Sequence, residues 1–440
     1  MPPEVYSHLI NQIHLLCAGN ASASGGIIPK VYFKNQTALA GGGKVWTTYL
    51  LDYAVPWFTS KDGGGSWSPF YADPASQTVP NGSFAHSFLA APRKDGNVHA
   101  PQMVRQNLGT LTDQTINTST ANYSSFAGNS PQQLVLDVAS GTITTKQLDA
   151  NLTISGIPRS LGLHGLLRFG GVSSIAQLPD GGMVISAMTV LAPPHANPDP
   201  KEETMSLVAF RSTDGGLNWV YASIIADPSH FPTAEEGPSE NGLALLDDGS
   251  NRIACVFRLD GGDGHPNHQM LPYGIAFSGD GGLTWSTPKM LKEGIGCACP
   301  QLMAIPGGGL MIAGGRTGAH NEDVVVFVNA AGDGEDWTPH SISYWHNALM
   351  APTPKSGVYP FDALINSSTF PRESTSYTSL VQTSTSSAVL LYSQWLRPGT
   401  VGGDVWRGYA MRISFARNET PKQFGTRARE SERNLNGLGL

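Results

Sequence analysis

One octapeptide pattern occurs three times in this 440-residue chain, as Ser60-Lys-Asp-Gly-Gly-Gly-Ser-Trp67, Ser212-Thr-Asp-Gly-Gly-Leu-Asn-Trp219 and Ser278-Gly-Asp-Gly-Gly-Leu-Thr-Trp285. The shared pattern, Ser-X-Asp-X-Gly-X-X-Trp, is typical of a hairpin turn. Its Asp can accept backbone N–H groups, its Gly allows a positive φ, and its Trp can fold back over the hairpin. One copy would be an ordinary Asp-Gly turn, but three copies predict a protein built from repeated hairpins.

The spacing of these octapeptides predicts the number of repeating units. The Trp residues that close the second and third copies are 66 residues apart, and a degenerate copy ends 52 residues later at Trp337, with Gly332 in place of the Asp. Each interval suits one four-stranded blade. The 152 residues between the first two copies suit two blades, and one more blade follows Trp337. We therefore expect an all-β fold, a six-bladed β-propeller with the octapeptides as its hairpin turns.

The domain organisation follows from the same pattern. We expect one propeller domain over residues 26–420, with an N-terminal extension over 1–25 and a disordered tail over 421–440. The blades are expected at 30–70, 80–150, 160–225, 236–290, 298–340 and 374–416. Residues 105–160 carry little pattern beyond Ser, Thr and Asn, so the second blade can contain an insertion there.

The composition narrows the classes of partner and location. A formal net charge of −7 argues against a nucleic-acid partner, and no apolar run approaches the length of a membrane span. Eight Asn-X-Ser/Thr sequons favour a secreted or secretory-pathway protein, although the N-terminus lacks the basic region of a signal peptide. Cys297 and Cys299 are two residues apart, which allows a strained disulfide but favours free buried thiols. No metal-ligand spacing is present, so we expect no metal and no cofactor.

Glu240 and Tyr377 occupy matching positions in two blades. When the apolar cores of the innermost strands are aligned, Leu243 lies opposite Leu380, and Glu240 and Tyr377 each lie three residues earlier. Sites in propellers lie at the axis, where the innermost strands meet, so we expect both side chains to face it.

Arg258 and Arg316 each end the second strand of a blade. A charge at the end of a buried strand needs a partner, and two kinds are open here. One is the carboxylate of a substrate, and the other is a protein acid in a structural ion pair between blades.

The repeats and the matched pair resemble the sialidase (neuraminidase) superfamily, in which this octapeptide is called an Asp box. The resemblance implies a retaining exo-glycosidase that removes a terminal sialic acid or related nonulosonic acid, with Tyr377 as nucleophile and Glu240 as its general base. The carboxylate on the anomeric carbon of such a sugar would repel an attacking carboxylate, whereas a neutral phenol avoids that repulsion. Because the pKa of a phenol is about 10, a base must remove its proton.

The resemblance also implies an acid and three cations. Asp52 is the expected general acid, with Glu235 or Glu236 as alternatives. Arg258 and Arg316 resemble the second and third arginines that hold the substrate carboxylate. The first arginine belongs to an Arg-Ile-Pro motif that is missing here, where the chain reads Val31-Tyr-Phe-Lys-Asn-Gln-Thr37. The residues that could replace it are Lys34 and Arg168.

Two other functions remain open. Exo-arabinanases share the fold, use two carboxylates and need no arginine triad, so the missing motif favours them. In such a neutral-sugar enzyme the arginines would be bound by protein acids. A non-catalytic carbohydrate-binding propeller would follow if Asp52 pointed away from the axis. In each case we expect a monomer with a glycan or glycoconjugate partner.

Overall fold

The structure is a computed structural model that describes residues 6–20, 27–34, 37–44, 58–62, 65–66, 68–69, 91–92, 98–101, 112–113, 119–124, 132–137, 142–147, 153–169, 175–192, 204–214, 218–261, 271–315, 324–343, 346, 378–396 and 405–417. Side chains are described within 60–66, 119–121, 153–163, 175–192, 204–214, 218–261, 271–315, 324–343, 346, 378–392 and 408–414, apart from the gaps already given.

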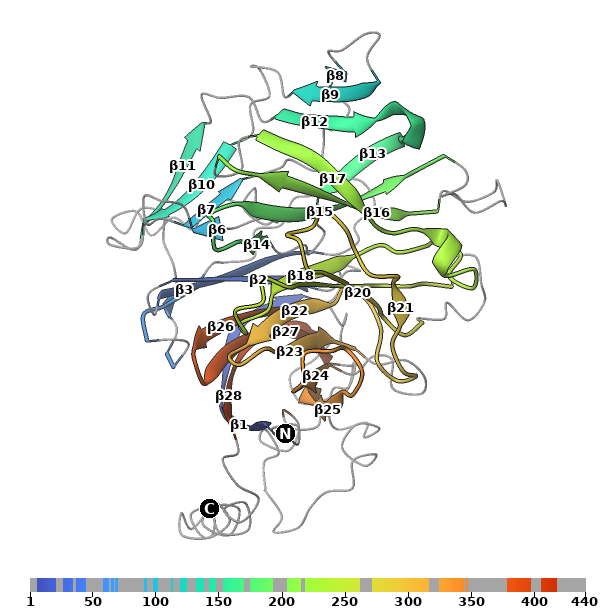
Figure 1. Cartoon of the computed structure of the whole chain (residues 1–440). Coiled ribbons are helices and arrows are strands. Elements are labelled where there is room, and N and C mark those ends of the chain that lie inside the picture. Colours follow the sequence, from blue (N-terminus) through green and yellow to red (C-terminus); the bar gives the residue numbers. More distant parts are fainter. Residues whose placement is uncertain are drawn as a thin grey trace, which may run out of the picture.

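The described strands form six sheets, five of them four-stranded and antiparallel (Figure 1). Three of these sheets take their strands in chain order. The first contains β2 (Ile27–Lys34), β3 (Thr37–Lys44), β4 (Phe58–Ser60) and β5 (Ser68–Pro69). The second contains β18 (Asn241–Leu245), β19 (Ile253–Phe257), β20 (Gly274–Ser278) and β21 (Lys289–Met290). The third contains β22 (Gln301–Ile305), β23 (Gly309–Gly314), β24 (Val325–Asn329) and β25 (Thr338–Ser341).

The other two four-stranded sheets join segments that are distant in the chain. One is formed by β6 (Ala91–Pro92), β7 (Val98–Pro101), β10 (Gln132–Asp137) and β11 (Thr142–Gln147). The other combines β26 (Thr378–Ser384), β27 (Ser387–Leu396) and β28 (Val405–Arg417) with β1 (Tyr6–Asn20) from the N-terminus. β1 therefore completes the sheet of the C-terminal strands, a pairing that the sequence did not indicate.

The sixth sheet is the largest. Its central strands are β15 (Met183–Val190), β16 (Ser206–Ser212) and β17 (Asn218–Ala226). One edge of β15 pairs with both β13 (His164–Phe169) and β14 (Ala176–Gln177). The other side continues through β12 (Thr153–Pro158), β9 (Thr120–Ser124) and β8 (Thr112–Asp113), and the β12–β17 pair is parallel. Two single helical turns have described bounds, η3 (Arg159–Leu161) and η4 (Pro228–His230).

The first strands of successive sheets contact one another. β14 contacts β18, β18 contacts β22, β22 contacts β26, and β26 contacts β2, so these strands gather near the middle of the molecule (Figure 1). β18 and β22 approach so closely that a Cβ on Gly242 would lie 2.9 Å from the backbone nitrogen of Leu302. Glycine is required at this position because any side chain would force the two strands apart.

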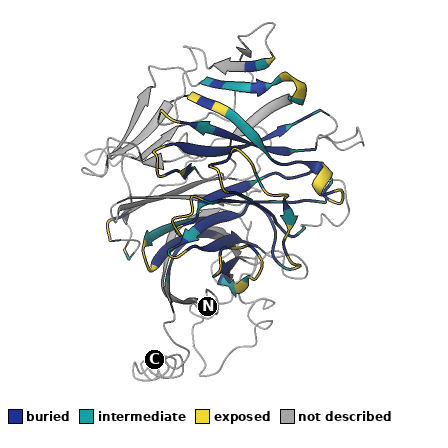
Figure 2. Ribbon diagram, in the orientation of Figure 1, coloured by how far each residue is buried: buried dark blue, intermediate teal, exposed yellow. Residues whose placement is uncertain are grey.

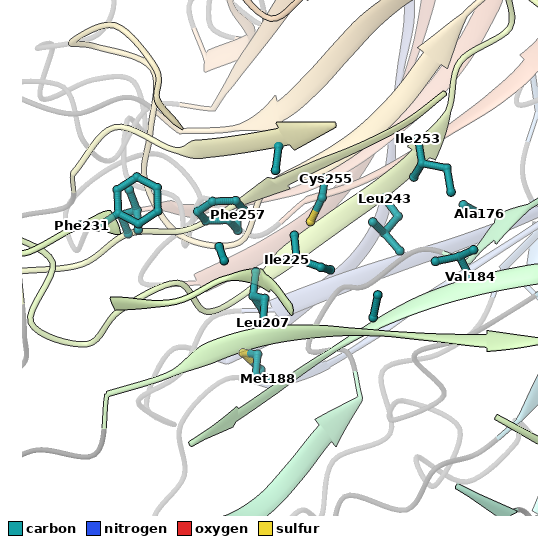
Figure 3. Packing of buried hydrophobic residues seen from close by; sticks show 14 of the residues in the cluster. Ala176, Val184, Met188, Leu207, Ile225, Phe231, Leu243, Ile253, Cys255 and Phe257 are labelled. Carbon is teal, nitrogen blue, oxygen red and sulfur yellow. The ribbon is translucent and has the colours of Figure 1, made fainter. Parts of the chain in front are cut away.

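The core consists of apolar layers between neighbouring sheets. One layer joins β15–β17 to β18–β20 through Leu207, Leu243 and Phe257 (Figure 3). A second layer lies between β18–β21 and β22–β25, and a third between β22–β25 and β26–β28. Buried residues accordingly follow the strands, while exposed residues gather at the turns (Figure 2). The all-β class predicted from the sequence is confirmed. Among the described residues, no helix has both the length and the apolar character needed to cross a membrane.

Candidate functional site

Glu240 and Arg258 lie side by side at one end of the β18–β21 sheet. Glu240 precedes β18 and Arg258 follows β19, and their backbones continue the pairing of these strands beyond their ends. The Arg258 N–H donates to the Glu240 carbonyl at 2.7 Å, and the Ser239 N–H donates to the Arg258 carbonyl at 3.1 Å. This register places the two side chains next to each other.

The guanidinium of Arg258 bridges two carboxylates. Its Nη1 donates to Glu240 Oε2 at 3.0 Å, and its Nη2 forms an ion pair with Asp260 Oδ2. The Asp260 side chain is 0% exposed, whereas those of Arg258 and Glu240 are 13% and 17% exposed. Glu240 is thus the carboxylate of the three-residue cluster that reaches furthest toward solvent.

The segment before β22 supplies a second donor to Glu240. The backbone N–H of Cys299 donates to Glu240 Oε2 at 3.1 Å. Cys299 has a φ of 40°, which is uncommon for a residue with a side chain. Cys297 and Cys299 are both buried, and both are thiols rather than members of a disulfide, as favoured from the sequence.

Tyr273, the residue before β20, is hydrogen-bonded to the segment that contains Cys297 and Cys299. Its hydroxyl donates to the Ala298 carbonyl at 2.9 Å and accepts the Gly315 N–H at 3.3 Å. Burial raises the pKa of Tyr273 well above its usual value, and the electrostatic influence of Cys297 adds to the rise. The phenol therefore stays protonated and acts as a buried donor. A Cβ on Gly314 would lie 2.1 Å from this hydroxyl, so only glycine fits there.

Asn241 ties the site to the neighbouring large sheet. Its side-chain amide donates to the Ser239 carbonyl at 3.1 Å and accepts a hydrogen bond from Ser186 of β15. Both side chains are buried. The start of β18, and with it Glu240, is therefore fixed from the preceding sheet as well as from the following one.

The remaining expected site residues are placed only in part. Tyr377, Arg316 and Asp52 lie outside the described residues. Thr378 opens β26 directly after Tyr377, as Asn241 opens β18 directly after Glu240.

Of Lys34 and Arg168 the structure describes only the backbone. Lys34 ends β2 at the hairpin to β3, whereas Glu240 lies where its own strand begins. Arg168 lies in β13 opposite Met188 of β15.

No group of three His, Cys, Asp or Glu residues in the described part of the chain has the geometry of a metal site. Asp260, Tyr273 and the Cys299 N–H were not anticipated from the sequence. Asp260 had a weak signal, since it stands two residues after an arginine at the end of a strand.

The other end of the sheet carries the octapeptide 278–285. Ser278 Oγ donates to Asp280 Oδ1 at 2.8 Å, the Thr284 N–H donates to the same oxygen at 2.9 Å, and Thr284 Oγ1 donates to Oδ2 at 2.6 Å. Partial burial opposes the shift, but these hydrogen bonds lower the pKa of Asp280. Asp280 is thus fully engaged within its own turn.

The first two octapeptides repeat this arrangement around Asp62 and Asp214. The opening Ser donates to the Asp at 2.8 Å in each, and the backbone N–H of the seventh residue donates at 2.9 and 3.0 Å. The seventh residue also donates from its side chain in all three copies; it is Ser66, Asn218 or Thr284. The shared octapeptide pattern leaves this position variable, but all three residues found there can donate a hydrogen bond.

The degenerate copy reaches a similar turn with other residues. Asn329 Nδ2 donates to Asp333 Oδ1 at 3.0 Å, and Asn329 Oδ1 accepts the Gly334 N–H at 3.1 Å. Trp337 Nε1 donates to the Gly334 carbonyl at 3.2 Å. Asp333, one position later than expected, therefore takes the role of the missing aspartate.

Comparison with known proteins identifies the fold and leaves the activity open. No protein-family model matches the chain, and no curated protein matches it. Among solved structures, a protein of unknown function from Dyadobacter fermentans matches with a TM-score of 0.51 and 13% identity, over 94% of this chain and 100% of that chain. A Hadza microbial sialidase matches with a TM-score of 0.50 and 14% identity, over 91% of this chain and 68% of that chain.

More distant matches include other glycoside hydrolases. An α-L-arabinanase from Penicillium chrysogenum matches with a TM-score of 0.45 and 13% identity, over 92% of this chain and 98% of that chain. Further sialidases match with TM-scores of 0.48 and lower, and the chain spans between 55% and 71% of their length. The match to the Hadza microbial sialidase shows a shared fold, and it assigns neither a substrate nor a mechanism to this chain.

Proposed function

We propose that the chain is a retaining exo-glycosidase on a six-bladed β-propeller, with its active site at the end of the sheets where Glu240 lies. Four observations support the propeller: six sheets, contacts between successive first strands, β1 completing the last sheet, and the fold shared with a sialidase. In a propeller the first strands line the axis, so residues that begin them converge there. The octapeptides are then Asp boxes on the outer hairpins.

The observation that carries the catalytic proposal is the way Glu240 is held. One carboxylate oxygen accepts both the Arg258 guanidinium and the Cys299 N–H, which fixes the side chain in an orientation before any substrate arrives. A fixed, partly exposed carboxylate suits a general base. Its sequence register with Tyr377, the residue before β26, supports pairing it with a phenol rather than with a second carboxylate.

The proposed reaction proceeds in two steps. Tyr377 Oη attacks the anomeric carbon while Glu240 removes the phenolic proton and Asp52 protonates the departing glycosidic oxygen. Water then attacks the same carbon and breaks the bond to Tyr377. Asp52 accepts a proton from the water, and Glu240 returns to the phenol the proton that it removed in the first step. Two displacements retain the anomeric configuration.

For the substrate we propose a terminal acidic sugar, such as a sialic acid, whose carboxylate is bound by Arg316, Arg258 and a third cation. Arg168 and Lys34 are the candidates for that third cation. The position of Lys34 at the hairpin end of β2 favours Arg168. On the evidence of the eight sequons we further propose a monomeric protein of the secretory pathway.

One observation favours a neutral sugar instead. Arg258 already forms ion pairs with Glu240 and Asp260. This is the arrangement expected in an enzyme whose substrate has no carboxylate. The alternative is an arabinanase-like exo-glycosidase in which Glu240 is one of two catalytic carboxylates.

The deciding experiment is a glycan panel of sialosides, ketodeoxynonulosonic acid glycosides and arabino-oligosaccharides, run with wild type and Tyr377→Phe. We expect release of an acidic sugar by the wild type and none by Tyr377→Phe, with matching circular dichroism spectra as the folding control. Turnover of arabino-oligosaccharides without release of acidic sugar would establish the neutral-sugar alternative. Binding without turnover of any glycan would establish a carbohydrate-binding propeller.

A further inference from the structure

Asp260 is a fully buried carboxylate two residues beyond Arg258, and the proposed reaction gives it no role. Its side chain is 0% exposed, and its described cation partner is the Nη2 group of Arg258. A buried carboxylate is costly unless a cation and hydrogen bonds compensate it. The ion pair with Arg258 is therefore part of what compensates the buried charge of Asp260.

The planar guanidinium transmits this constraint to Glu240. Because the two terminal nitrogens of arginine are held in one rigid plane, fixing Nη2 on Asp260 also fixes the direction of Nη1. Nη1 meets Glu240 Oε2 at 3.0 Å, on the oxygen that also accepts the Cys299 N–H. Arg258 is therefore anchored on its buried side and presents its other nitrogen to the more exposed carboxylate.

We propose that Asp260 is a positioning residue: it anchors Arg258, and Arg258 in turn orients Glu240 for its role as base. This inference rests on the proposed function of Glu240 and holds for an acidic or a neutral sugar. It also assigns Arg258 a first role within the protein, so that any contact with a substrate carboxylate is additional to it.

A double-mutant cycle tests the anchor. The variants are Asp260→Asn, Arg258→Lys and their combination. Lysine keeps the charge but lacks the rigid fork. In the wild-type background we expect Asp260→Asn to lower kcat on the order of 10- to 100-fold, the range found for groups that orient a catalytic ligand, with KM little changed. In the Arg258→Lys background the same substitution should lower kcat by much less, because the fork it anchors is already gone.

Thermal unfolding gives a second readout that needs no activity. Arg258→Met removes the cation described beside the buried Asp260, so adding Asp260→Asn to Arg258→Met should lower the Tm much less than Asp260→Asn does in the wild type. The matched control is Asp248 and Arg252, an exposed pair at the opposite end of the same sheet with a 3.5 Å contact. Asp248→Asn and Arg252→Met should combine additively in Tm.

Three results would contradict the proposal that Asp260 positions Arg258. They are an equal loss of kcat in both backgrounds, an unchanged kcat for Asp260→Asn, and effects on Tm that are as additive as those of the control pair. Failure of the proposed function looks different. In that case the wild type would release no sugar from any glycan, while the Tm cycle would still show strong coupling between Asp260 and Arg258.

Discussion

The two ends of the β18–β21 sheet use carboxylates in opposite ways. At the turn end, Asp280 accepts hydrogen bonds from Ser278, Leu283 and Thr284, all within four residues of it. At the site end, Glu240 is held by Arg258 and the Cys299 N–H, which are 18 and 59 residues away. The first arrangement forms with the hairpin itself. The second exists only when two sheets have folded and packed together, so its geometry depends on the whole fold.

Substitutions at the two ends of the sheet should differ most in their effect on kcat. Glu240→Gln keeps the shape of the side chain but removes the base, and we expect kcat to fall by roughly 10²–10⁴-fold, the usual contribution of general acid–base catalysis. Asp280→Asn should leave kcat unchanged and lower the Tm, because it weakens a turn. Steady-state kinetics and thermal unfolding of both variants check this. If Asp280→Asn lowered kcat as much as Glu240→Gln does, the assignment of catalysis to the Glu240 end alone would be wrong.

A second comparison concerns the ion pairs at the two ends. Arg258→Met removes the cation described beside the fully buried Asp260, and we expect a loss of about 3–5 kcal/mol in the free energy of unfolding. Arg252→Met removes the partner of the more exposed Asp248 and should cost about 0–1 kcal/mol. Urea unfolding of both variants provides the measurement. Equal losses would show that the burial of Asp260 contributes nothing to the difference.

A third prediction tests the support behind the Cys299 segment. Tyr273→Phe removes the hydroxyl bonded to Ala298 and Gly315, leaving buried backbone groups without it, at a cost of about 1–3 kcal/mol. Tyr221→Phe is the control, since Tyr221 packs edge-on against Phe210 through its ring. It should be nearly neutral in urea unfolding. If Tyr273→Phe lowers the free energy of unfolding no more than Tyr221→Phe does, the Tyr273 hydroxyl does not stabilise the Cys299 segment.

The smallest expected effect is the pH response of the turns. Hydrogen bonds from Ser66 and Ser60 overcome the effect of partial burial and lower the pKa of Asp62 from 3.8 to about 2. A depressed pKa in the folded state adds stability above the unfolded value, and that stability is lost as the pH falls through the folded value. The Tm difference between wild type and Asp62→Asn should therefore shrink between about pH 4 and about pH 2. A constant difference across this window would contradict the assignment.

The comparison of the two ends also explains what the sequence could predict. The octapeptides were recognisable because Asp62, Asp214 and Asp280 accept hydrogen bonds from residues close to them in the chain. Each turn is therefore specified by one short sequence motif that repeats. The position of Glu240 directly before a first strand was likewise readable from the apolar register around Leu243.

The contacts that complete the site were not readable, because they are long-range. Nothing in the local sequence joins Glu240 to Cys299, or Tyr273 to Gly315, since packing between sheets creates these pairs. The same holds for the pairing of β1 with β28. In the degenerate turn a one-residue shift of the aspartate to Asp333 concealed a hydrogen-bond pattern that the structure makes plain.

Trapping the reaction intermediate shows whether Glu240 and Tyr377 act as one catalytic pair. Wild-type enzyme is mixed with an activated aryl glycoside of the best panel substrate, quenched in acid during turnover, and digested for peptide mass mapping. We expect a sugar adduct on Tyr377, and a much smaller amount of it in Glu240→Gln because the phenol then lacks its base. An adduct on a carboxylate such as Glu240, with Tyr377 unmodified, would contradict this expectation.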